Sequence, residues 1–163
     1  MTIAPIRRDV VVKVPPARAF SAFTKDMVRW WPGYSIAANP FVAIEIEPRE
    51  GGRWFERDAD GAETPWGKVL TWDPPGRLVL AWQIDATFKH DPKVMTEVEL
   101  TFTAQADGTT LVSFEHRKLE RLGESAAIAA EQMRGGWVGI LDGFAQYASS
   151  TAGEASAPQE TAK

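Results

Sequence analysis

The stretch MRGGWVGILDGF, residues 133–144, combines helical spacing of its apolar residues with four glycines. At about 100° per residue, one arc of this helix collects the apolar side chains: Met133, Trp137, Ile140, Leu141, Phe144, Tyr147 and Ala148. The glycines lie beside or just beyond that arc. An interior glycine costs a helix about 1 kcal/mol relative to alanine, so the segment accepts a penalty of about 3–4 kcal/mol. The pattern predicts a long helix, beginning near Glu124, with one apolar face and glycines, which lack a side chain, beside that face.

Glycines on a helix flank can serve two purposes that do not exclude each other. They can let the helix backbone approach a neighbouring sheet closely, which requires no ligand. They can also leave space beside Trp137 and Phe144, into which an apolar guest fits. Gly136 and Gly143 are the glycines predicted to shape such a cavity.

Upstream of this helix, short alternating stretches are separated by Gly and Pro turns, which is typical of antiparallel strands. They predict strands over residues 6–14, 41–47, 51–57, 66–72, 77–84, 96–104 and 109–116. The clearest is TEVELTFTA (96–104), where Val98, Leu100 and Phe102 share one face and a hairpin tip follows at Asp107-Gly108. The hairpin joins this strand to the last one.

Pro15-Pro16 ends the first strand and precedes ARAFSAFTKDMVRWW (17–31), which predicts two short helices. Trp30 and Trp31 cannot both face inward from one helical turn unless the chain bends, so one is expected at the surface or at a cavity mouth. The predicted fold is α+β, of the helix-grip type: a curved antiparallel sheet of six or seven strands wrapped around the long C-terminal helix. Residues 1–148 form one domain, and the polar residues 149–163 are predicted to be a disordered tail.

The composition limits the classes of function. A net charge of −4 without a run of Lys or Arg argues against nucleic-acid binding, and no apolar run is long enough to span a membrane. The chain has no cysteine and two histidines, so no metal site and no cofactor are predicted. A cytoplasmic protein, monomeric or weakly dimeric, is expected.

Five stretches together resemble a known family: AFSAFTKDMVRWWP (19–32), GGRWFERDADG (51–61), WGKVLTWDPPGRLVLAW (66–82), VELTFTAQADGTTLVSFEH (98–116) and GGWVGILDGFAQY (135–147). They are similar to START-like proteins, the SRPBCC superfamily that includes birch-pollen-allergen-like proteins. Within it they resemble the branch named for the C-terminal domain of the activator of the heat-shock protein 90 ATPase. The resemblance covers residues 6–148. It implies an apolar cavity between the long helix and the sheet.

Candidate ligand-binding residues come from the strands and from the helix. Aromatic and apolar side chains suit a small-molecule pocket, and the predicted set is Trp54, Trp66, Trp82, Phe102, Met133, Trp137 and Phe144. Glu56 shares the strand phase of Trp54, and His116 shares that of Phe114, so both are predicted to face inward and to orient a ligand or transfer a proton.

The leading hypothesis is binding of a hydrophobic or aromatic small molecule between the helix and the sheet, with no catalytic residue assigned. Two alternatives stay open. One is an enzyme of the cyclase or hydrolase type that uses Glu56 or His116 as acid or base. The other is a co-regulator of a chaperone ATPase, or another interaction module.

Overall fold

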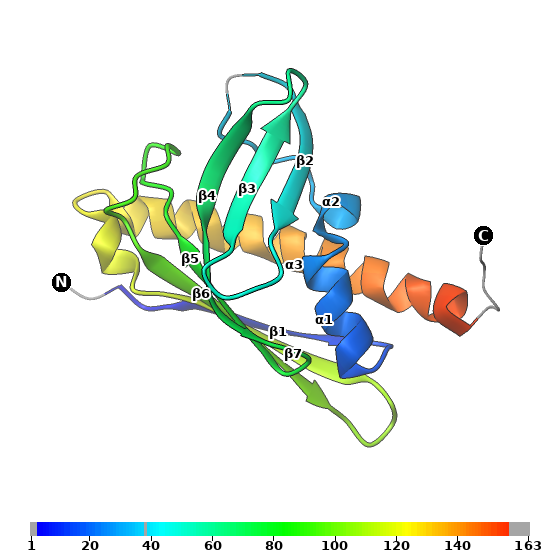
Figure 1. Cartoon of the computed structure of the whole chain (residues 1–163). Helices are drawn as coiled ribbons and strands as arrows, with labels where there is room; N and C mark the ends of the chain where they lie inside the picture. The colour runs from blue at the N-terminus through cyan, green and yellow to red at the C-terminus, as the bar shows by residue number, and fades with distance from the viewer. Residues whose placement is uncertain (1–2, 38, 157–163) are drawn as a thin grey trace.

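A seven-stranded antiparallel sheet curves around one long helix (Figure 1). The computed structural model describes residues 3–37 and 39–156, with side chains up to residue 150. The strand order is β1-β7-β6-β5-β4-β3-β2, so β1 and β2 form the two edges of the sheet. The strands span Ile6–Val12 (β1), Phe41–Ile46 (β2), Arg53–Asp58 (β3), Glu63–Asp73 (β4), Arg77–Trp82 (β5), Thr96–Ala104 (β6) and Thr110–Arg117 (β7). The predicted helix-grip fold is confirmed.

The β6–β7 hairpin shows why the alternating pattern predicts the sheet well. Leu100 pairs with Phe114 and Phe102 with Val112, and all four side chains are buried on the inner face. Because successive residues of a strand point to opposite faces, this register places every second residue in the core. Strand β4 begins at Glu63, three residues earlier than predicted, since Glu63, Thr64 and Pro65 pair with Arg57, Glu56 and Phe55 of β3.

Gly67 in β4 allows β4 and β5 to approach closely. A Cβ atom at this position would lie 1.7 Å from the carbonyl oxygen of Ala81 in β5, which no side chain could tolerate. Its neighbour Trp66 is thereby held against the same strand pair, and the backbone carbonyl of Trp66 accepts a hydrogen bond from the amide of Gln83 (2.8 Å). A glycine in a strand typically marks such a close approach.

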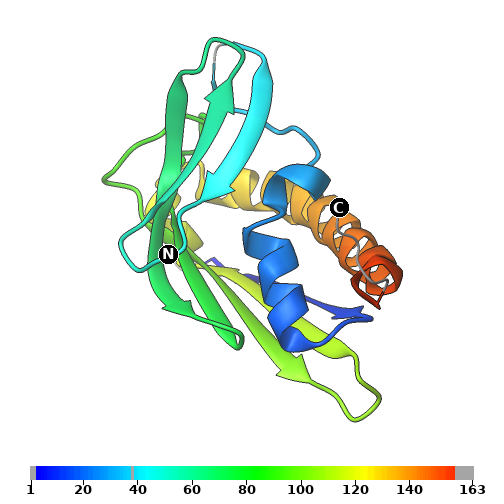
Figure 2. The same cartoon turned by 45° about the vertical axis from the view of Figure 1, so that its right-hand side comes forward.

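The helices are α1 (Pro16–Thr24), α2 (Met27–Trp30), the 3-10 helix η1 (Leu119–Leu122) and α3 (Ala126–Ser156). Figure 2 shows α3 lying along the inside of the curved sheet, with α1 and α2 beside its C-terminal half. α3 contacts β1, α1, α2 and η1. No helix in the described ranges is both long and apolar enough to cross a membrane.

The C-terminal helix extends past residue 148, the predicted end of the domain, as far as Ser156. Residues 149–156 are thus helical and differ from the predicted disordered tail. The amide of Lys13 donates a hydrogen bond to Ser149 Oγ (3.1 Å), which connects the first of these turns to the end of β1. The rest of the predicted tail, residues 157–163, lies outside the described residues.

Both Trp30 and Trp31 are buried, at 8% and 7% exposure, so both face inward, which the sequence allows only where the chain bends between them. The chain bends between them, because α2 ends at Trp30 and Trp31 has extended backbone angles. Trp30 packs against Phe23 and Phe144, with ring centroids 5.2 Å from each, and its Nε1 donates to the carbonyl oxygen of Ala22 (2.7 Å). Trp31 turns instead toward the cavity under α3.

Candidate ligand-binding site

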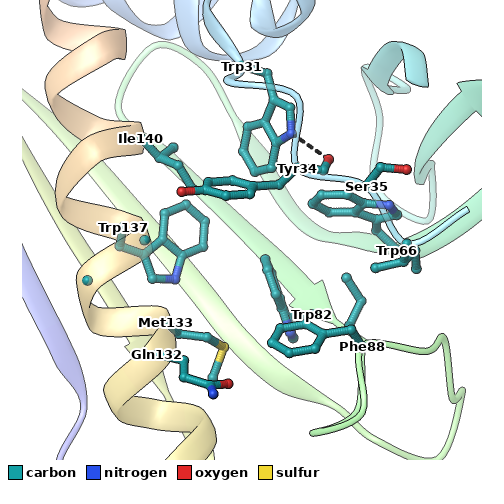
Figure 3. A pocket seen from close by; sticks show the side chains of 14 residues that line it. Trp31, Tyr34, Ser35, Trp66, Trp82, Phe88, Gln132, Met133, Trp137 and Ile140 are labelled. Atoms are coloured by element: carbon teal, nitrogen blue, oxygen red, sulfur yellow. Dashed lines mark hydrogen bonds between the residues drawn. The ribbon is translucent and has the colours of Figure 1, made fainter. Parts of the chain in front are cut away.

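A pocket of about 390 Å³ lies between the N-terminal half of α3 and the inner face of the sheet (Figure 3). Its volume is within the range typical of small-molecule sites, and its walls are mainly apolar. Helix α3 supplies one wall through Gln132, Met133, Gly135, Gly136, Trp137 and Ile140.

The glycines of α3 differ in what they face. A Cβ atom at Gly135 or Gly136 would meet no atom within 4 Å outside the helix, although both residues line the pocket. These two glycines therefore keep space open and do not serve close packing against the sheet. Gly143 is different, because its Cβ would lie 3.7 Å from the carbonyl oxygen of Trp30, outside the pocket. The prediction that Gly143 shapes the cavity is not supported by this placement.

Four indoles surround the pocket, and we call them the tryptophan quartet: Trp31, Trp66, Trp82 and Trp137. Each ring neighbours two others in a closed sequence. The centroid distances are 5.2 Å for Trp31–Trp66, 5.8 Å for Trp66–Trp82, 5.6 Å for Trp82–Trp137 and 6.5 Å for Trp31–Trp137. Tilted and edge-to-face packing at such distances stabilises the rings, so the wall is preorganised.

Two loops close the mouth of the pocket with aromatic side chains. Tyr34, in the segment after α2, is 54% exposed, and Phe88, in the loop between β5 and β6, is 48% exposed. Phe88 has a φ of +64°, a left-handed conformation that is costly for a bulky residue. Asp85 holds this loop by accepting hydrogen bonds from the amide (2.8 Å) and the hydroxyl (2.6 Å) of Thr87, and the hydroxyl bond lowers the pKa of Asp85.

Glu56 faces inward as predicted, but it lies behind the pocket wall and not on it. Its carboxylate is fully buried and accepts hydrogen bonds from the Ser35 hydroxyl (2.5 Å), the Ile36 amide (2.7 Å) and Trp66 Nε1 (2.8 Å). All three donor residues line the pocket. Glu56 therefore fixes one indole and the segment after α2, since a buried carboxylate needs every such bond.

His116 is also buried and is enclosed by its own partners. Trp137 Nε1 donates to His116 Nδ1 (3.1 Å), because an indole nitrogen can only donate. The proton of the neutral imidazole is thus on Nε2, which faces the hydroxyl oxygen of Thr96 (2.8 Å). Burial lowers the pKa of His116 to about 3. The imidazole stays neutral and orients Trp137, and it does not reach the pocket.

The remaining predicted residues fall into two groups. Trp66, Trp82, Met133, Gly136 and Trp137 line the pocket. The others lie outside it. Trp54 packs behind Trp66 and Trp82 (5.6 Å to each ring), Phe102 packs against Phe20 (5.3 Å), and Phe144 packs against α1 and α2.

Sequence reasoning missed Tyr34, Phe88 and Ile84 as lining residues. Tyr34 and Phe88 belong to irregular segments, where no periodicity indicates a direction. The only signal for Phe88 is an aromatic residue in an otherwise polar loop. Within the described residues, no group of three or more His, Asp or Glu side chains could hold a metal ion.

Comparisons with known proteins agree with this architecture. Residues 13–149 match the family described as "Activator of Hsp90 ATPase homolog 1-like protein". The structure described as the anthrahydroquino-γ-pyrone synthase Txn09, complexed with a compound abbreviated SUM, shares 34% identity, covering 89% of this chain and 97% of that one, with a TM-score of 0.64.

Two further structures are similar. The self-sacrificing resistance protein CalC from Micromonospora echinospora shares 28% identity, covering 95% of this chain and 97% of CalC, with a TM-score of 0.67. Protein MLL2253 from Mesorhizobium loti, at 18% identity, 88% and 95% coverage and a TM-score of 0.64, shows the fold alone. None of the curated proteins compared with the chain matches it. The family match over most of the chain and the 34% identity to Txn09 establish that the chain belongs to the activator of Hsp90 ATPase homolog 1-like family, within the START-like superfamily.

Proposed function

We propose that the protein binds a flat, aromatic and largely apolar small molecule in the pocket beneath α3. The observation that carries this proposal is the tryptophan quartet around a space of about 390 Å³ that Gly135 and Gly136 leave open. Indole faces favour stacking with flat rings, and a rigid wall binds without a large cost in side-chain entropy.

The neighbours support an aromatic ligand. Txn09, at 34% identity, is described as a synthase of an anthrahydroquino-γ-pyrone and was solved with a bound compound, and CalC is described as a resistance protein. The pocket volume of about 390 Å³ is in the range of sites that hold small ring compounds.

The test uses N-phenyl-1-naphthylamine, an uncharged probe whose emission rises in apolar surroundings. We expect binding to quench tryptophan emission, because four indoles surround the site. Met133→Gln is expected to weaken probe binding at least severalfold, since it places an amide in the pocket wall. Ile128→Gln is the matched control, because Ile128 is exposed on the outer side of the same helix. Equal affinity in both variants would count against the pocket as the binding site. Native mass spectrometry of protein purified from its own source would identify a co-purified ligand.

Catalysis is the second candidate function, and the identity to Txn09 favours it. In that case the protein would act as a synthase on a compound of the anthrahydroquinone type. The pocket would position the rings and exclude water, with Ser35, which lines the pocket, and its hydrogen-bond partner Glu56 as the candidate polar pair. Glu56→Gln can still accept from Ile36 and Trp66, so turnover lost with retained binding would support this candidate.

Regulation of a chaperone ATPase stays a prediction, for which the family description is the only support. The measurement is the ATPase rate of the chaperone with and without this protein. Stimulation that survives a pocket-filling variant such as Gly136→Leu would separate this activity from ligand binding.

A further inference from the structure

The quartet indoles each carry one hydrogen-bond donor, and three of the four donors are already used by the protein. Trp31 Nε1 donates to the carbonyl oxygen of Tyr34 (3.0 Å). Trp66 Nε1 donates to Glu56 (2.8 Å), and Trp137 Nε1 donates to His116 (3.1 Å). None of these three donors is left for a ligand.

Trp82 is the exception. Its Nε1 donates to no residue in the described part of the chain, and it is not among the fully buried polar atoms that lack a partner, so it keeps contact with solvent. Trp54 Nε1 also lacks an acceptor, but it is completely buried, so it cannot serve a ligand. Trp82 is 8% exposed and lines the pocket, so we place its accessible donor on the pocket side.

The Trp82 ring is held in place from several sides. Its centroid lies 5.2 Å from that of His116, 5.6 Å from Trp54 and from Trp137, and 5.8 Å from Trp66. Figure 3 shows Trp82 at the centre of the pocket, beside Phe88 and facing α3. Because the ring is packed on these sides, the donor is fixed in direction.

The other polar side chains of the pocket are placed differently. Gln132 and Tyr34 are exposed at the mouth. The Ser35 hydroxyl donates to Glu56 and accepts from the amide of Ala37 (3.2 Å). The interior of the pocket thus offers one fixed side-chain donor among apolar surfaces, and a donor in such surroundings favours a ligand that carries an acceptor.

We infer that the ligand is an aromatic carbonyl compound, of the quinone or polycyclic ketone class, whose C=O accepts a hydrogen bond from Trp82 Nε1. This inference rests on the proposed binding function and specifies its ligand. The rings of the ligand contact the quartet, while the carbonyl fixes its orientation in the pocket.

The test compares fluorenone with fluorene, which have the same three-ring shape and differ by a C=O in place of a CH₂ group. Both are measured by displacement of N-phenyl-1-naphthylamine from the wild type and from Trp82→Phe. We expect Trp82→Phe to reduce the preference for fluorenone over fluorene by about three- to tenfold, the range of one net hydrogen bond. Taking the ratio of the two affinities cancels the difference in hydrophobicity between the compounds.

Trp31→Phe is the matched control, because it removes an indole whose donor is already bonded to Tyr34. The fluorenone preference should be unchanged in this variant. As a second readout, the carbonyl stretch of bound fluorenone should lie at lower frequency in the wild type than in an apolar solvent. The carbonyl frequency is measured on the wild type alone, so it tests for a hydrogen bond to the bound carbonyl even if Trp82→Phe does not fold.

The outcomes separate the two proposals. Binding of both compounds with an equal ratio in wild type and Trp82→Phe, or a carbonyl stretch at the apolar-solvent position, overturns the inference and leaves ligand binding intact. Failure of the probe and of both compounds to bind the wild type overturns the binding function and the inference together.

Discussion

Gly136 offers the sharpest test of the pocket, because alanine and leucine at this position have opposite consequences. An alanine Cβ would meet no atom within 4 Å beyond the helix itself. Gly136→Ala should therefore gain the full helix preference of alanine over glycine, about 0.8–1.0 kcal/mol. For a chain of 163 residues this raises the melting temperature by about 2–4 °C.

Gly136→Leu keeps the helix and sends a whole isobutyl group into the pocket of about 390 Å³. The folded state has room for the side chain only where a ligand would lie. We expect stability at or above that of the wild type, with an affinity for N-phenyl-1-naphthylamine reduced at least tenfold, equivalent to about 1.4 kcal/mol. Because most substitutions destabilise a protein, a loss of probe binding without a loss of stability would indicate that the leucine side chain fills the pocket.

Gly139 provides the control, since a Cβ there also meets open space but the residue does not line the pocket. Gly139→Leu should raise stability and leave the probe affinity unchanged. Thermal unfolding by circular dichroism and probe titration are measured on the same preparations. Wild-type affinity in Gly136→Leu would refute the reasoning about the ligand site, and a lower melting temperature in Gly136→Ala would refute the reasoning about open space.

Three further predictions concern groups around the pocket. In the folded protein the pKa of His116 is lowered to about 3, whereas in the unfolded chain His116 binds a proton near pH 6.5. The free energy of unfolding, measured by urea titration, should therefore fall by about 2 kcal/mol from pH 8 to pH 5. His116→Gln should reduce this dependence of stability on pH. Trp66→Phe should destabilise by about 1–2 kcal/mol more than Trp54→Phe, because it removes one of the three donors to the buried carboxylate of Glu56, whereas Trp54 Nε1 has no acceptor to lose. Equal melting temperatures of the two variants would argue against this account. Phe88→Gly replaces a residue strained by its left-handed backbone with one that adopts this conformation without steric cost, so stability should be unchanged or higher by about 1 kcal/mol while probe binding weakens. Phe88→Ala keeps the backbone strain. A probe affinity that neither change affects would show that Phe88 is not part of the binding site.

The sequence alone determined the fold and the inward phase of most site residues. Alternation in the strands places Trp66 and Trp82 on the concave face, and the helical arc of α3 places Met133 and Trp137 toward the sheet. Both periodicities follow from backbone geometry, so they can be read without knowing which elements are neighbours. The same phase rule correctly placed Glu56 and His116 inside.

Which buried residues border the pocket depends on how distant segments pack together in the folded chain. Met133 and Phe144 share one helical arc, yet Met133 borders the pocket and Phe144 packs on Phe23 of α1, because α3 is long enough to meet different elements along its length. Tyr34 and Phe88 come from irregular segments whose direction is set by long-range contacts. His116 likewise appears as a candidate base in the sequence, and its burial beside Trp137 makes it a neutral support. Periodicity fixes the face on which a side chain lies, whereas its neighbours on that face depend on how distant segments pack together.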